Sequence, residues 1–96
     1  MFPPAVFDLA FALPHEVAAS VLITAVHEGA SGLLETVDVF DVFTGDTIGK
    51  GRKSIAVRIR LRATDRTLTD EEVVPVRKAI VERVSEVTGG ELRGLA

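Results

Sequence analysis

Cysteine is absent from all 96 residues of the sequence. Without thiols the chain can form no disulfide framework, zinc finger, iron–sulfur cluster or thiol nucleophile. Long apolar runs are also missing: Val17 to Val26 has about ten residues, whereas a membrane span needs about 20. No basic segment follows Met1, as a signal peptide would require. We therefore expect a cytoplasmic protein without a membrane partner.

Side chains that carry metal or nucleophilic chemistry are scarce. The two histidines, His15 and His27, stand twelve residues apart, which is not a metal-ligand spacing. We expect both on the surface of a helix. The sequence also lacks a P-loop. It therefore predicts no catalytic residue, no metal site and no cofactor in this chain.

The length and composition indicate one domain, residues 1–96. A chain of this size can bury roughly 60–65% of its unfolded surface, which is enough for one core. Hydrophobic residues make up 47% and charged residues 26%, a mixture typical of folded rather than disordered chains.

Basic residues are concentrated in one part of the chain. Seven of the eleven Lys and Arg residues lie between positions 50 and 66, where Asp65 is the only acid. The whole chain has a net charge of -3, so the remainder is strongly acidic. This segregation indicates a basic surface with an acidic back, although a solvated strand face would give the same pattern.

Two segments alternate in the period of two that is typical of a half-buried strand. Ala5 to Leu13 has one face of large apolar residues and one of mostly small residues. Arg52 to Arg62 has one aliphatic and one cationic face. The residues expected to face the core are Phe7, Leu9, Phe11, Leu13, Ile55, Val57, Ile59 and Leu61.

A further strand, Leu33 to Phe43, breaks this alternation at Phe40, where one apolar residue follows another. A β-bulge there would turn Phe40 and Val42 inward. Asp41 and Phe43 would then face outward.

The first expected helix runs from His15 to Glu28 and ends at Gly29, a residue typical of the position after a helix. No preferred N-cap residue begins it. Its expected apolar stripe consists of Ala18, Val21, Leu22 and Ala25.

The second expected helix begins with a capping box, Thr69 and Glu72, and ends at Gly89-Gly90. Pro75 lies beyond its first turn, where proline removes a hydrogen bond, and so predicts a kink or a late start.

With a loop at residues 44–51 and a short last strand at Glu91 to Arg93, the element order is β-α-β-β-α-β. This order predicts an α+β, ferredoxin-like fold, in which both helices cover one face of a four-stranded antiparallel sheet. The other face would be open.

Three functional groups would converge on this open face. In a hairpin of the second and third strands, Phe43 lies opposite Ser54, and Asp41 lies opposite Ala56. A ring can stack on an RNA base, a carboxylate can accept from its amino groups, and a hydroxyl can donate or accept. The basic residues expected to attract phosphates are Arg52, Lys53, Arg58, Arg60 and Arg62.

Each of these residues also has a plainer interpretation. Phe43 could belong to the core, Asp41 could be a solvated strand residue, and Ser54 could be a small polar filler.

Several motifs together resemble a known family. They are F-D-V-F at 40–43, G-K-G-R-K-S-I-A-V-R at 49–58, D-R-T-L-T-D-E-E-V at 65–73, E-L-R-G at 91–94, and the opening F-P-x-x-x-x-D-L-A. They are similar to the ferredoxin-fold anticodon-binding domain that closes the β subunit of bacterial phenylalanine–tRNA ligase. The resemblance covers nearly the whole chain.

The resemblance implies that the chain binds the anticodon stem-loop of phenylalanine tRNA, with Asp41, Phe43 and Ser54 contacting anticodon bases. It implies further partners, the rest of the β subunit and the α subunit, in a cytoplasmic heterotetramer of two α and two β. Catalysis would belong to the α subunit, which binds ATP, magnesium and phenylalanine. Because the family places this domain at the end of a long subunit, Met1 is expected to open a fragment.

Two positions depart from the family pattern. Phe43 stands where the family usually has Tyr, so it keeps the stacking ring and loses a hydroxyl hydrogen bond. Val6 and Phe7 stand where the family commonly has Arg.

Two other classes share this architecture. An ACT-like regulatory or protein-interaction module would bury the open face in a dimer, which Ala10, Ala12 and Ala56 would permit. The arginines argue against it, because buried unpaired charge is costly. An acylphosphatase-like hydrolase needs a glycine-rich anion loop with an Arg after the first strand, which residues 13–16 do not supply.

Overall fold

The computed structural model describes residues 2–45 and 48–95, and its elements follow the order β-α-β-β-α-β. Part of the loop expected at 44–51 lies outside the described residues. The elements are β1 (Ala5–Pro14), α1 (Ala19–Ala30), β2 (Leu34–Phe43), β3 (Arg52–Leu61), α2 (Asp70–Thr88) and β4 (Glu91–Leu95).

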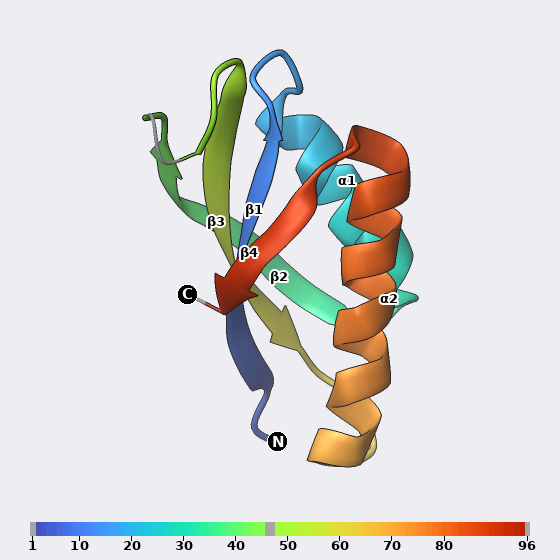
Figure 1. Ribbon diagram of the computed structural model, residues 1–96. Helices are drawn as coiled ribbons and strands as arrows, with labels where there is room; N and C mark the ends of the chain where they lie inside the picture. The colour runs from blue at the N-terminus through green and yellow to red at the C-terminus, as the bar shows by residue number, and fades with distance from the viewer. Residues whose placement is uncertain (1, 46–47, 96) are drawn as a thin grey trace.

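The four strands form one antiparallel sheet in the order β2-β3-β1-β4. Both helices pack on the same side of this sheet, and its opposite side carries no helix (Figure 1). The expected ferredoxin-like fold is therefore confirmed. None of the helices in the described ranges is long and apolar enough to cross a membrane.

The alternating patterns of β1 and β3 locate the core. All eight residues expected to face inward belong to the core between sheet and helices, seven of them buried and Phe7 partly buried at its edge. From the helices, Leu22 and Val26 of α1 and Ile80 and Val84 of α2 complete it.

Helix α1 begins and ends later than expected. Residues before Ala19 form a turn, in which the His15 amide donates to the Gly51 carbonyl at 2.8 Å. The N-cap, Ala18, makes no side-chain capping bond, as its residue type implies. At the other end, the left-handed residue is Ser31, with φ of 51°. Residues 15–18 were expected in the helix because of their composition, but the structure places them in the turn before it.

Gly29 lies inside α1 and permits a close approach of the two helices. A Cβ atom on Gly29 would stand only 2.6 Å from Cα of Ile80 and 3.0 Å from the carbonyl oxygen of Ala79. The expected role of Gly29 as the residue after the helix is therefore wrong. Because the helices meet there, the buried stripe includes Ala30, whereas Ala18 and Val21 are exposed.

Gly29→Ala should destabilise the protein by about 1–3 kcal/mol, because its methyl group would collide with the backbone of α2. The better helix propensity of Ala, worth about 1 kcal/mol, opposes this effect only in part. Urea denaturation measures the change. Ser20→Ala, on the exposed side of α1, is the control and should change stability little. Unchanged stability of Gly29→Ala would contradict the close approach.

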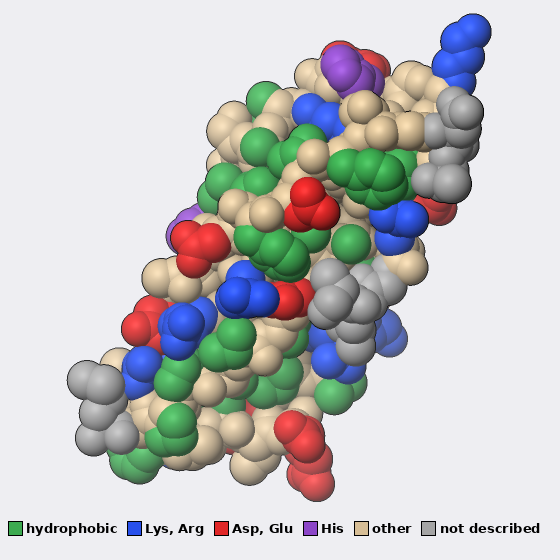
Figure 2. Space-filling model, turned by 90° about the vertical axis from the view of Figure 1, so that its left-hand side faces the viewer, with side chains coloured by type: hydrophobic (Ala, Val, Ile, Leu, Met, Phe, Trp, Pro, Cys, Tyr) green, Lys and Arg blue, Asp and Glu red, His purple; other side chains and the backbone are tan. Residues whose placement is uncertain are grey.

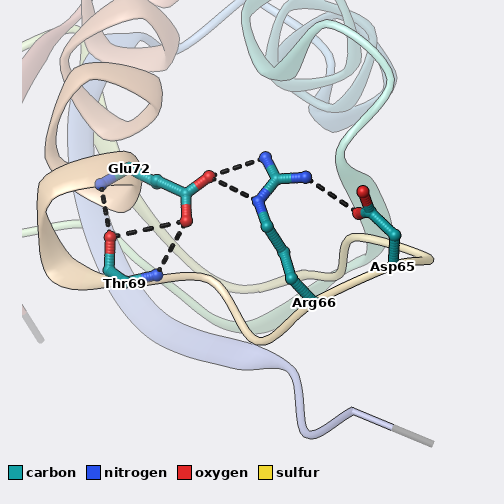
Figure 3. Close-up of polar contacts among 4 residues, drawn as sticks. All are labelled: Asp65, Arg66, Thr69 and Glu72. Carbon is teal, nitrogen blue, oxygen red and sulfur yellow. Dashed lines mark hydrogen bonds and ion pairs between the residues drawn. The ribbon is translucent and has the colours of Figure 1, made fainter.

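The N-terminus of α2 is closed by the expected capping box (Figure 3). The Glu72 amide donates to Thr69 Oγ1 at 3.3 Å, and the Thr69 amide donates to Glu72 Oε1 at 3.3 Å. Arg66 Nε donates to the other oxygen of Glu72 at 2.8 Å. The helix begins at Asp70 and continues through the exposed Pro75, so a late start is wrong.

Strand β2 contains the expected bulge, between Val39 and Asp41. Phe40 is the extra residue, and its ring lies against the guanidinium of Arg58 on the open side of the sheet. The prediction that Phe40 faces the core is therefore wrong. Val42 does lie on the helix side, opposite Ile55, but it is 53% exposed and so is not part of the core.

Candidate nucleic-acid interface

The open face is built from rows of opposed residues that cross the sheet. In one row Phe43 of β2 lies opposite Ser54 of β3, and Ser54 lies opposite Ala12 of β1. In the next row, Asp41 lies opposite Ala56. These pairings are the ones expected from the hairpin, so Asp41, Phe43 and Ser54 share one face of the sheet.

The three groups differ in their access to solvent. Phe43 is 42% exposed, and Asp41 is exposed as well. Ser54 is only 4% exposed, so the expectation that its hydroxyl projects into water is wrong. Its strand is internal to the sheet, and Arg93 Nη1 of β4 donates to its Oγ at 3.2 Å.

Arg93 completes this cluster, although the sequence patterns did not single it out. Its guanidinium lies over the Phe43 ring, with Cζ 5.7 Å from the ring centroid. Arg93 therefore links the ring to Ser54 through a cation–π contact and a hydrogen bond. The register of β4 shifts beside β1 between Ala10 and Phe11, so alternation along this short strand could not assign Arg93 to a face. In the sequence, the E-L-R-G motif at 91–94 was the signal that could have identified Arg93 as a functional residue.

Three of the basic residues that were expected to attract phosphates are not available for this on the open face. Two of them are paired with other groups of the chain, and one lies on the helix side of the sheet. Arg52 donates to the Ala12 carbonyl at 2.9 Å and lies 3.5 Å from Glu91. Arg62 forms a 2.7 Å ion pair with Glu35. Lys53 lies opposite Leu13 and shares the register of the core-facing residues, so it belongs to the helix side of the sheet.

Arg58 is held by Asp8 on the neighbouring strand. Its Nε and Nη2 atoms donate to the two carboxylate oxygens of Asp8, each at 2.9 Å. This hydrogen bonding, with the attraction of the guanidinium, lowers the pKa of Asp8 below its ordinary value. Arg60, opposite Val6 and Thr36, forms no ion pair within the described part of the chain.

The open face is consequently mixed in charge rather than uniformly basic. Figure 2 shows basic and acidic side chains interspersed among hydrophobic ones on this side of the molecule. The acids come from other elements than the basic segment: Asp8 from β1, Glu35 from β2 and Glu91 from β4. The expected basic surface is corrected in this respect, because strand pairing neutralises part of the charge.

Residues 2–45 and 48–95 contain no group of three or more His, Cys, Asp or Glu side chains that could hold a metal ion. The open face offers groups suited to recognition: an accessible ring, an accessible carboxylate and guanidinium groups held in fixed positions.

Nearly the whole chain matches one family model. The model is that of the ferredoxin-fold anticodon-binding domain, and it covers residues 1–93. The chain belongs to this family.

Curated relatives agree with this assignment. The chain is 48% identical over 93 residues to the phenylalanine–tRNA ligase beta subunit of Thermobifida fusca, which is 97% of this chain. It is 46% identical to the subunit of the same name from Cutibacterium acnes and 44% to that of Paramagnetospirillum magneticum, over 96% and 91% of this chain. In each case it spans only 11% of the relative's length.

The ion pair of Arg58 with Asp8 on the open face makes the stability of this anticodon-binding domain depend on pH. Because folding lowers the pKa of Asp8, the stabilisation is complete above about pH 4 and is lost as the pH falls through the lowered value. Asp8→Asn should therefore melt at a lower temperature than the wild type at pH 7. The difference should shrink below about pH 4, as measured by circular dichroism. A difference that stays constant down to pH 2 would contradict the pairing.

Proposed function

We propose that this chain is the anticodon-binding domain of a phenylalanine–tRNA ligase β subunit and binds the anticodon loop of phenylalanine tRNA on its open sheet face. The observation that carries the proposal is the exposed Phe43 ring beside the exposed Asp41, on the side of the sheet that no helix covers. An unstacked base can lie on the ring, and the carboxylate can accept from an exocyclic amino group.

Arg93 and Ser54 are hydrogen-bonded to each other beside this base-binding site. The hydrogen bond between them is 3.2 Å long and fixes the guanidinium against the Phe43 ring. Because the hydroxyl is buried, Ser54 acts in this proposal through Arg93, and reaches a base directly only if that guanidinium moves aside. Arg58 and Arg60 are the remaining basic groups of the open face that can attract the phosphates.

The chain itself supplies recognition, and catalysis lies elsewhere in the ligase. We propose that the rest of the β subunit and an α subunit are its partners, in an assembly of two α and two β subunits in the cytoplasm. ATP and magnesium would bind to the α subunit. Since acids offset part of the basic charge of this face, most of the phosphate contacts with tRNA must come from those other parts.

Phe43→Leu should weaken binding of a phenylalanine tRNA anticodon stem-loop to this chain by about 5- to 150-fold, because base stacking contributes about 1–3 kcal/mol. Phe43→Tyr keeps the ring and should bind at least as well as the wild type. Fluorescence anisotropy with a labelled stem-loop at low salt measures both.

Val42→Ala is the matched control, because Val42 is the neighbouring exposed apolar residue on the opposite side of the sheet. It should bind RNA like the wild type. Equal affinity of Phe43→Leu and wild type would rule out stacking on this ring.

A module that dimerises through the sheet is the competing class, and one observation favours it. Arg58 is already paired with Asp8, so burying this face would not leave that charge unpaired. We nevertheless expect a monomer in analytical ultracentrifugation, because Phe43 and Asp41 remain available to RNA only in that state. A tight dimer whose formation blocks the stem-loop would favour the competing class.

A further inference from the structure

The bulge in β2 presents a second aromatic ring on the open face. Phe40, the bulged residue, is 47% exposed, slightly more than Phe43. Exposure of a large apolar ring costs free energy unless a partner covers it. The site described above does not use Phe40.

A fixed guanidinium accompanies this ring. Cζ of Arg58 lies 5.0 Å from the centroid of the Phe40 ring. Asp8 holds Nε and Nη2 of Arg58 through two hydrogen bonds of 2.9 Å, which leaves Nη1 with its two donors. The side chain of Arg58 is 51% exposed, so these donors can reach a ligand from solvent. The arrangement offers a π surface and an oriented donor for an anion.

The open face thus carries the same pair of groups twice. Phe43 lies with Arg93, and Phe40 lies with Arg58. Phe40 and Phe43 are three positions apart in β2, which corresponds to about 10 Å along a strand. Stacked neighbours in a nucleic-acid strand are only about 3.4 Å apart. The two rings are therefore far enough apart for each to take a different base.

We propose that Phe40 and Arg58 form a second nucleotide subsite, which takes another base of the same single-stranded RNA loop and, through Nη1 of Arg58, a phosphate beside it. The inference rests on the proposed function, since the two subsites lie on one continuous face. A base fits this subsite better than an apolar side chain of a protein, because the ring lies beside a cation and single-stranded RNA supplies both a π surface and an anion.

The test scans the anticodon stem-loop with 2-aminopurine, placed at one loop position at a time. This base fluoresces more when it is not stacked. We expect wild-type protein to quench two separate positions. Phe43→Leu should restore the fluorescence of one position and Phe40→Leu that of the other, with each variant binding about 5- to 150-fold more weakly.

Two further variants separate a binding role from a structural one. Phe40→Tyr keeps the ring and should bind and quench like the wild type. Arg58→Gln should lower the slope of log affinity against log salt concentration by about 1, which loss of one phosphate contact predicts. Circular dichroism melts identify any variant that fails to fold. If Phe40→Leu is such a variant, the separate variants Phe40→Tyr and Arg58→Gln still test whether this subsite binds RNA.

The outcomes distinguish the two proposals. If Phe43→Leu weakens binding while Phe40→Leu binds and quenches like the wild type, the second subsite is overturned and the proposed function stands. If both variants bind like the wild type, the proposed function fails, and the second subsite fails with it.

Discussion

One extra residue in β2 governs which side chains reach the open face. The bulge between Val39 and Asp41 lets the strand bury Val39 and still direct Asp41 and Phe43 away from the helices. Without it, the alternation that buries Val39 would turn both of them toward the core side. Phe40 follows the inward Val39, so ordinary alternation directs it outward, where it lies against Arg58. The Phe43 ring and the Asp41 carboxylate on this face therefore share one cause in the backbone.

Ion pairs between strands determine the electrostatic character of that face. The bidentate pair of Arg58 with Asp8 joins β3 to β1, and the pair of Arg62 with Glu35 joins the end of β3 to β2. Such pairs orient guanidinium groups at fixed positions, and they also reduce the long-range attraction for RNA. A face of this kind suits selective contact with a few groups of a ligand better than long-range attraction of a polyanion.

The helices have a supporting role, and their contact depends on a small residue. Gly29 lets α1 approach the backbone of α2 at Ile80, and both helices can then cover the core side of the same sheet. This packing leaves the opposite side free along its whole width (Figure 1). The sequence predicted that α1 ends at Gly29. A glycine that ends a helix cannot be told from a glycine at a helix–helix contact by sequence alone.

The sequence alone determined the element order, the core faces of β1 and β3, the capping box of α2 and the shared face of Asp41, Phe43 and Ser54. All of these follow from periodicity or from contacts between residues close in the chain. The tertiary structure decided the burial of Ser54, the contact of Arg93 with Phe43, the contact of Arg58 with Phe40 and the pairing of Arg58 with Asp8. Each of these depends on a neighbouring strand or on a bulge, and no period along a single segment encodes which side chain a distant strand brings alongside.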